Sequence, residues 1–315
     1  MPSTPVADIR LITDGLEFPE GPVALDNGDV LVCEIKGQRI TRVKPDGTKQ
    51  HVADVPGGPN GAALGPDGVL YLANNGGCFT WLDMMGFTFP GPPPDTWTGG
   101  SIDRLDLATG ALTTLYRASG DTRLRAPNDL VMDGHGGVWF TDHGVRLERS
   151  SDRTGVHYAR LDGSESREVE FPVDAPNGIG LSPDGTKLYW AETHTGRVFQ
   201  RMIASPGELA PTMGPLDPNV LLCGLPGMQL FDSLAVDGAG HVCVATLVNG
   251  GITVIDPVSG DSEHVNFGAE YADPLTTNIC FGGPDLRTAY ITLSGTGRLI
   301  SCIWPRPGLR LHHAR

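Results

Sequence analysis

The sequence contains no stretch of about 18 consecutive apolar residues, the length that a membrane-spanning helix requires. Residues 1–12 also lack the apolar core of a secretory signal peptide. Basic residues are few, since 23 Lys and Arg stand against 37 Asp and Glu and leave a formal net charge of −14. We therefore expect a cytoplasmic protein that binds neither nucleic acid, whose phosphates require Lys and Arg, nor an anionic membrane.

Cysteine is sparse, and no long helical stripe of apolar residues is visible. None of the six cysteines stands in C-x-x-C spacing, and Cys33, Cys243, Cys280 and Cys302 lie in apolar stretches typical of strands. We expect these thiols to pack as small apolar groups rather than to serve in metal binding or redox chemistry. Glycine (43) and proline (26) are abundant, as expected where many short strands need tight turns.

One sequence phrase recurs six times along the chain. Each copy begins with a head of small and polar residues, such as Pro19-Glu20-Gly21 or Pro176-Asn177-Gly178, and continues through a Gly-containing turn into an apolar strand. Repeats at about 40 to 50 residues are the signature of a propeller or a solenoid. An oxygen-bearing residue stands in every head: Glu20, Asn60, Asn128, Asn177, Asp232 and Asn278.

The repeats also predict the architecture. After the first head, Val30–Cys33 and Arg39–Val43 are short stretches rich in β-branched residues, and a turn and an outer strand follow. About four strands per repeat is typical of a propeller blade. We predict an all-β, six-bladed β-propeller with four-stranded antiparallel blades around a central channel, and we treat residues 1–315 as a single domain.

The second repeat carries an insertion at about residues 74–98. It is dense in aromatic residues, methionine and proline, which is unusual for a loop exposed to solvent. Three placements remain open: a lid over the central channel, a contact between subunits of a homo-oligomer, or a loop packed on its own blade.

The heads are predicted to converge. The residue just before the innermost strand of a blade lies at one mouth of the channel, so equivalent residues of different blades meet on the axis. Two carboxylates in a small space repel each other unless a cation lies between them. Oxygen ligands suit a hard divalent ion, and we expect Ca²⁺ first, with Mg²⁺, Mn²⁺ or Zn²⁺ as alternatives. The residues concerned are Glu20, Asn128, Asn177 and Asp232. Asn or Asp before Gly is also an ordinary turn signal, but six heads in register favour a site.

The order of the heads over nearly the whole chain resembles the SMP-30/gluconolactonase/luciferin-regenerating family. The resemblance rests on Pro19-Glu20-Gly21-Pro22, Pro127-Asn128-Asp129, Pro176-Asn177-Gly178 and Asp232-Ser233. It implies a six-bladed propeller with one divalent ion on its axis and hydrolase activity, usually on lactones. It also implies metal ligands at Glu20, Asn177 and Asp232, with Asn128 at a fourth position that binds metal, substrate or water.

For a lactone substrate, we predict that the ion polarises the carbonyl group while water attacks it, with Asp232 as the general base. Arg125 lies three residues before Asn128, whereas family members often carry a basic residue two positions before this Asn. Strand-end His143 is also compatible with a simple hydrogen bond at the surface. A sugar lactone such as gluconolactone and a more apolar lactone are both compatible with the sequence. The predicted substrate contacts are Asn60, Arg125, Asn128, His143 and Asn278.

Other functions remain as alternatives. A phosphotriester hydrolase of the fluorophosphatase type would carry a His on its last blade, where this chain has Thr292–Thr296 without one. A strictosidine-synthase-like propeller typically lacks the metal residues that are present here. A non-catalytic binding propeller usually carries repeat signatures such as Trp-Asp, and no Trp-Asp dipeptide occurs. Metal binding without catalysis is the remaining alternative.

Overall fold

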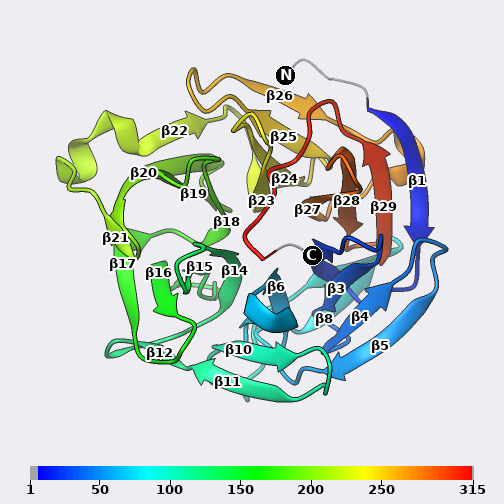
Figure 1. Cartoon of the computed structure of the whole chain (residues 1–315), viewed down its shortest axis with the longest axis horizontal. Coiled ribbons are helices and arrows are strands. Elements are labelled where there is room, and N and C mark those ends of the chain that lie inside the picture. Colours follow the sequence, from blue (N-terminus) through cyan, green and yellow to red (C-terminus); the bar gives the residue numbers. More distant parts are fainter. Residues whose placement is uncertain (1–5, 314–315) are drawn as a thin grey trace.

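The computed structural model describes residues 6–313. Six antiparallel sheets are arranged around a central axis, which confirms the predicted six-bladed propeller (Figure 1). Five sheets have four strands, and the fourth blade carries an additional short strand. No helix in this described part of the chain is long and apolar enough to cross a membrane.

The first three blades follow the chain from the axis outward. Their strands are β2 (Pro19–Ala24), β3 (Val30–Glu34), β4 (Arg39–Val43) and β5 (Lys49–Asp54); β6 (Pro59–Leu64), β7 (Val69–Asn74), β10 (Ser101–Asp106) and β11 (Leu112–Tyr116); and β14 (Pro127–Met132), β15 (Gly137–Asp142), β16 (Thr154–Arg160) and β17 (Ser166–Val173).

The other three blades are built in the same way. Their strands are β18 (Pro176–Leu181), β19 (Lys187–Glu192), β20 (Arg197–Ser205) and β22 (Leu221–Gly224), with β21 (Glu208–Leu209) paired to β20; β23 (Leu230–Val236), β24 (Val242–Leu247), β25 (Ile252–Ile255) and β26 (Ser262–Val265); and β27 (Thr276–Gly282), β28 (Thr288–Leu293), β29 (Arg298–Ile303) and β1 (Ala7–Thr13). Two small hairpins join β8 (Trp81–Met84) to β9 (Phe87–Pro90) and β12 (Ala118–Ser119) to β13 (Thr122–Arg123).

The innermost strand of every blade contains the head itself, so the prediction that the heads precede this strand was wrong. The apolar stretches that follow the heads form the second strands instead. Strands such as β6 begin with Pro and contain Gly, two residues that are depleted in strands. Their extended form depends on pairing with the second strand and on contact with neighbouring blades, which a propensity argument does not include.

A β-bulge follows the start of each innermost strand. In the second blade Pro59 pairs with Asn74 and Ala62 pairs with Leu72, so two residues of β6 oppose a single residue of β7. A register shift at the corresponding place occurs in all six innermost strands. Since a bulge changes the direction in which a side chain points, it re-aims the head relative to a regular strand.

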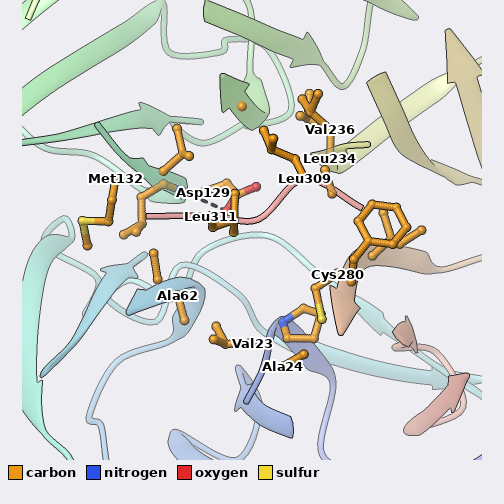
Figure 2. A pocket seen from close by; sticks show the side chains of 18 of the residues that line it. Val23, Ala24, Ala62, Asp129, Met132, Leu234, Val236, Cys280, Leu309 and Leu311 are labelled. Atoms are coloured by element: carbon orange, nitrogen blue, oxygen red, sulfur yellow. Dashed lines mark hydrogen bonds between the residues drawn. The ribbon is translucent and has the colours of Figure 1, made fainter. Parts of the chain in front are cut away.

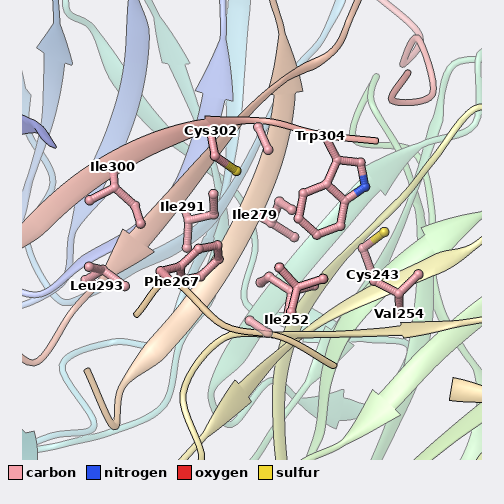
Figure 3. Packing of buried hydrophobic residues seen from close by; sticks show 13 residues of the cluster. Cys243, Ile252, Val254, Phe267, Ile279, Ile291, Leu293, Ile300, Cys302 and Trp304 are labelled. Atoms are coloured by element: carbon pink, nitrogen blue, oxygen red, sulfur yellow. The ribbon is translucent and has the colours of Figure 1, made fainter. Parts of the chain in front are cut away.

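The last blade is closed by the other end of the chain. Its outer strand is β1, which pairs antiparallel with β29 and brings Thr13 opposite Leu299. The apolar core fills the space between adjacent blades. Between the fifth and sixth blades, Ile252, Ile279, Ile300 and Trp304 belong to one cluster of buried side chains (Figure 3).

The C-terminal segment runs from the sixth blade back to the axis (Figure 1). Its backbone is paired there, because Gly308 donates to the carbonyl of Leu286 at 2.8 Å and Leu309 donates to the carbonyl of Val236 at 3.1 Å. Leu309 and Leu311 lie at a cavity of about 110 Å³ on the axis, which the innermost strands surround (Figure 2). The segment therefore covers the mouth of the channel at the end away from the heads.

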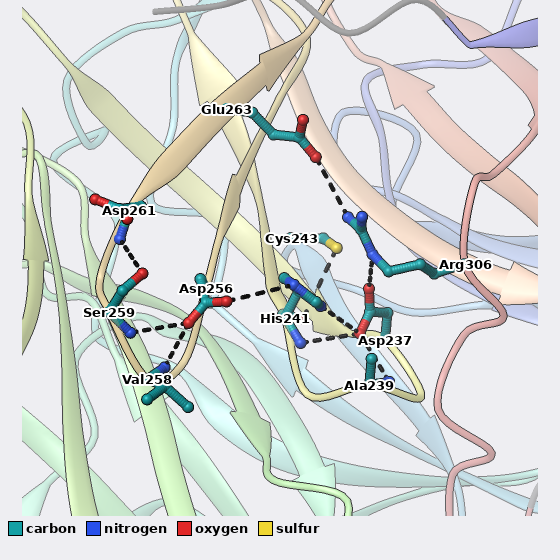
Figure 4. A network of polar contacts seen from close by, with 10 residues as sticks. All are labelled: Asp237, Ala239, His241, Cys243, Asp256, Val258, Ser259, Asp261, Glu263 and Arg306. Atoms are coloured by element: carbon teal, nitrogen blue, oxygen red, sulfur yellow. Dashed lines mark hydrogen bonds and ion pairs between the residues drawn. The ribbon is translucent and has the colours of Figure 1, made fainter.

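Arg306 anchors this segment through a buried carboxylate (Figure 4). Its Nε donates to Asp237 at 2.6 Å, and a second guanidinium nitrogen lies 3.5 Å from Glu263. Asp237 has no exposed surface and also accepts hydrogen bonds from the backbone of Ala239 and His241. A carboxylate so deep in the protein requires a cationic partner.

We expect Arg306→Ala to destabilise the protein by about 2–3 kcal/mol, because it leaves the Asp237 carboxylate buried without its cation. Arg310→Ala in the same segment is the matched control, since Arg310 and Asp26 are both exposed and 3.8 Å apart. This control should change the free energy of unfolding by no more than about 0.5 kcal/mol. Urea denaturation of both variants measures the difference, and equal losses would contradict the anchoring role.

Candidate functional site

The six head side chains meet around the propeller axis. The innermost strands contact each other in the cyclic order β2, β6, β14, β18, β23 and β27, and β27 returns to β2. We call these side chains the axial ring. All are buried, with exposed fractions of 2% for Glu20, 5% for Asn60, 7% for Asn128, 4% for Asn177, 8% for Asp232 and 5% for Asn278.

Glycine after the head allows the strands to approach so closely. A Cβ atom on Gly21 would lie 2.2 Å from the carbonyl oxygen of Asn60, and one on Gly61 would lie 2.6 Å from that of Asn128. In the fourth blade, a Cβ atom on Gly178 would lie 2.3 Å from the backbone nitrogen of Leu234. These distances are below any real Cβ contact, so glycine is required at these three positions by packing, and at Gly21 also by its positive φ of 47°.

Hydrogen bonds within and between blades orient three side chains of the axial ring. The Nδ2 of Asn278 donates to Glu20 at 2.7 Å, and its Oδ1 accepts from the backbone of Ile279 at 2.8 Å. The Nδ2 of Asn177 donates to the hydroxyl of Thr193 at 3.0 Å. Glu20, Asn177 and Asn278 are thus held by defined partners rather than being free to rotate.

Asp129 is a third buried carboxylate that the sequence analysis did not assign to the site. It occupies the position where three other heads carry Gly, and it lies on the axial cavity (Figure 2). Its carboxylate accepts a hydrogen bond from the backbone of Leu130 at 2.8 Å. The signal available in the sequence was an acid at this position, where the other heads carry Gly, Ser or Ile.

Burial raises the pKa of all three carboxylic acids, and for Glu20 and Asp232 the charge of a neighbouring acid adds to this effect. Desolvation raises the pKa of Glu20 well above its usual value, and the charges of Asp232 and Asp129 raise it further. Desolvation also raises the pKa of Asp232 and of Asp129 to about 7, although hydrogen bonds to each carboxylate act in the opposite direction. No Lys, Arg or His among residues 6–313 forms an ion pair with any of the three.

The axial ring fits a divalent cation with oxygen ligands. The Oδ1 atoms of Asn60 and Asn128 are buried and accept no hydrogen bond in the described structure. A buried carbonyl oxygen of this kind requires a water or an ion. Within residues 6–313 no three His, Cys, Asp or Glu side chains are placed to hold a metal together, so the amide oxygens would have to contribute. Carboxylate and amide oxygens are the donors that Ca²⁺ and Mg²⁺ prefer.

Buried polar side chains at the ends of the second strands fix the backbone that enters each head. Asp142 accepts hydrogen bonds from the backbone of Arg125 and of Ala126, both at 2.7 Å. Glu34 accepts from Glu17 at 2.6 Å in the same way. Asn74 accepts from Gly58 at 2.9 Å, and Glu192 accepts from Asp174 at 3.2 Å. The sequence analysis missed these positioning residues, because each binds a backbone group that lies 16 to 18 residues away in the sequence.

The predicted contacts Arg125 and His143 lie on the third blade near Asn128. The Nε of Arg125 donates to Asp152 at 2.9 Å, and its guanidinium carbon lies 4.5 Å from the ring centroid of Trp97. The Nδ1 of His143 lies 3.0 Å from the carbonyl oxygen of Gly144. Arg125 therefore already has an anionic and an aromatic partner in this structure.

The insertion packs on residues that precede the heads of several blades. The ring centroids of Trp81 and Phe18 are 4.9 Å apart, and Phe18 stands two positions before Glu20. Ala126, two positions before Asn128, packs in a cluster with Phe79 and Trp97 of the insertion. Leu275 of the sixth blade packs with Phe79, Trp81 and Phe89. The insertion thus lies at the same end of the propeller as the heads.

Comparison with known proteins identifies the family and the fold. Residues 18–295 match the model of the SMP-30/Gluconolactonase/LRE-like region. A gluconolactonase of Zymomonas mobilis is 26% identical over 310 residues, covering 89% of this chain and 76% of that protein. Two solved structures share the fold: a gluconolactonase of Xanthomonas campestris (22% identity, TM-score 0.72, 95% of this chain and 90% of that chain) and the calcium-binding protein regucalcin of Agrobacterium tumefaciens (18% identity, TM-score 0.71, 99% and 100%).

In the presence of a chelator, we expect the wild-type protein to lose stability relative to Asp232→Asn as the pH rises from 5 to 8. A folded-state pKa of about 7, above the unfolded value near 4, gives a stability contribution that is complete below pH 4. This contribution is lost as the pH rises through 7, and the relative change should be on the order of 2–4 kcal/mol. Denaturant unfolding at each pH measures it.

Asp184→Asn serves as the control for this experiment. In the wild type, hydrogen bonds from Ser182 and Thr186 lower the pKa of Asp184 to about 2. This carboxylate therefore stays ionised between pH 5 and 8. The difference between this variant and the wild type should stay constant over that range. If the difference in the free energy of unfolding between Asp232→Asn and the wild type also stayed constant with pH, this result would contradict the raised pKa.

Proposed function

The chain belongs to the SMP-30/Gluconolactonase/LRE-like family, and from this membership we propose that it is a hydrolase that opens lactone rings with one divalent cation. The observation that carries the proposal is the axial ring, in which buried carboxylates without cationic partners adjoin buried amide oxygens without donors. Curated relatives include gluconolactonases and other lactonases at about a quarter identity, which supports this reaction class.

We propose that Glu20, Asn177 and Asp232 hold the cation, with Asn128 as a fourth ligand, and that the ion is Ca²⁺ before Mg²⁺, Mn²⁺ or Zn²⁺. When bound, such an ion polarises a carbonyl group and stabilises the negative charge that develops on its oxygen. Both polar atoms of the Asn278 side chain have partners, because its nitrogen donates to Glu20 and its oxygen accepts from the backbone of Ile279. We therefore assign Asn278 to positioning Glu20 rather than to substrate contact.

Asp232 acts as the general base in this proposal. Its carboxylate takes one proton from water as the water oxygen bonds to the carbonyl carbon of the lactone. The ring C–O bond then breaks with its electron pair on the ring oxygen, and the proton held by Asp232 moves to that oxygen. The product is the open hydroxy acid, and no atom or charge is left over. Asn60 and Asn128 would bind substrate oxygens beside this centre.

We further propose that the insertion is a lid over the site. Its aromatic residues pack on residues next to the heads of the first, third and sixth blades, and its hairpin is tied to the sixth blade by a 2.8 Å hydrogen bond from Thr88 to Gly295. A lid of this composition gives the pocket one apolar wall, and it excludes water from the carbonyl except for the reacting molecule.

Lactone hydrolysis should depend on a cation and on Glu20. We expect chelation to abolish turnover of glucono-δ-lactone, one divalent ion to restore it, and Glu20→Gln to lower kcat/KM by at least about 100-fold. Asp232→Asn should lower kcat by a factor of about 10² to 10⁴, the range for loss of a general base. Proton release followed with a pH indicator measures all three effects.

Several results would contradict this assignment. A protein that binds a divalent ion tightly and hydrolyses no sugar, aliphatic or aromatic lactone is not a lactonase, and phosphotriesters would then be tested. Full activity in the chelated protein would exclude the cation, and an unchanged Asp232→Asn enzyme would exclude this base. Glu270→Gln, at an exposed acid of the fifth-to-sixth blade connection, is the matched control and should keep wild-type turnover.

The lid can be tested separately through Trp81. We expect Trp81→Ala to lower kcat/KM for the aromatic lactone dihydrocoumarin by about tenfold and that for glucono-δ-lactone by less than about threefold, because burial of an aromatic ring is worth roughly one to two kcal/mol. Equal effects on both substrates would contradict an apolar wall. Phe171→Ala, at an exposed aromatic residue of the third blade, is the control.

A further inference from the structure

Two imidazoles from adjacent blades lie together at the head end of the propeller. The ring centroids of His143 and His194 are 6.0 Å apart, and the rings meet edge to face. The backbone of His143 donates to the carbonyl of Ala126, two positions before Asn128, at 3.0 Å. His194 directly follows Thr193, whose hydroxyl accepts the hydrogen bond of Asn177. The imidazole pair therefore borders the heads of the third and fourth blades.

Most of the hydrogen-bonding capacity of this pair is unused. A carbonyl oxygen can only accept, so the contact with Gly144 places the proton of neutral His143 on Nδ1 and leaves Nε2 as an acceptor. In the described part of the chain, neither this Nε2 nor either ring nitrogen of His194 has a hydrogen-bond partner. Both rings are half-buried, so their nitrogens require water or a ligand that reaches the mouth.

Burial favours the neutral form of both rings. Burial lowers the pKa of His143, and burial together with the neighbouring His143 and Arg146 lowers the pKa of His194 to about 4, whereas Asp174 acts weakly in the other direction. A neutral imidazole offers one donor and one acceptor. A hydroxyl group has the same combination, so a polyhydroxylated ring can satisfy several of these nitrogens at once.

We propose that His143 and His194 form a hydroxyl-binding wall beside the axial ring and thereby select hydroxylated lactones over unsubstituted ones. This inference rests on the proposed lactonase function and adds its substrate class. The pair is next to the apolar wall, since Val145 packs in the cluster that contains Phe79 and Trp97 of the insertion. The pocket would then bind a ring with one hydroxylated face and one apolar face.

The kinetic test compares two six-membered lactones, glucono-δ-lactone with its hydroxyls and δ-valerolactone without them. We expect His143→Phe and His194→Phe each to lower kcat/KM for glucono-δ-lactone by about tenfold, the value of one hydrogen bond, mainly through KM. Turnover of δ-valerolactone should stay within about threefold. His194→Gln, which keeps a donor and an acceptor, should recover part of the loss. His135→Phe, at the opposite end of the propeller, should change neither substrate.

A binding test on the wild-type protein does not depend on catalysis. Ring ¹⁵N shifts of His143 and His194 are followed by NMR during titration with 1,5-anhydroglucitol, which carries the hydroxyls but no lactone carbonyl, and with tetrahydropyran, which carries neither. We expect the first compound to move both resonances and the second to move neither. The starting spectrum should show both rings neutral at pH 7.

The two tests separate the failure of this inference from the failure of the lactonase proposal. A wild-type protein that hydrolyses no lactone but shows the shifts retains the hydroxyl-binding wall and loses the reaction. Active wild-type protein with equal losses on both lactones, or with no loss, overturns the selective role of the pair. If 1,5-anhydroglucitol moves neither resonance, the result overturns hydroxyl binding. This outcome can be read even if a phenylalanine variant does not fold, because the titration uses the wild-type protein.

Discussion

The close approach of six innermost strands on one axis is the constraint on which the rest of this structure depends. The strands come so near because the residues after three of the heads have no side chain. The Cβ that Gly21, Gly61 or Gly178 lacks would lie within 2.6 Å of the next strand's backbone. A bulge then turns each head relative to its strand. Close packing of the backbones thus brings together polar heads that are far apart in the sequence.

This packing creates an electrostatic problem, because no cationic side chain of residues 6–313 pairs with the acids that it brings together. Three carboxylic acids are buried together, although the chain pairs other buried acids carefully: Asp237 has Arg306, and Glu34 has Arg39 at 2.7 Å. The acids of the axial ring differ from these in two ways: no cation pairs with them among the described residues, and buried amide oxygens without donors lie beside them. The strand-end acids such as Asp142 serve another purpose, since they hold backbone N–H groups and set the direction from which each head enters.

Much of the architecture could be predicted from the sequence, because repetition is a property of the chain itself. The six heads, their order and the four-stranded blades follow from repeated residues, and the structure has them. The innermost strands were missed since their Pro and Gly residues contradict strand propensity, and contacts between blades override it. Asp129, His194 and the strand-end acids were missed because their roles depend on neighbours distant in sequence. The position of the insertion is likewise set by Phe18, Ala126 and Leu275, which no local pattern connects to it.

The pairing of β1 with β29 also has a consequence for how the protein is made. The first strand leaves the ribosome long before its partner exists, and it cannot complete a blade until residues 298–303 have been synthesised. The contact between Glu20 and Asn278 is equally late, because it joins the first and last innermost strands. A nascent chain therefore carries its acids apart and exposed to water, and their crowding arises only in the final step of assembly. A cation that binds the axial ring would therefore stabilise the closed propeller rather than any single blade.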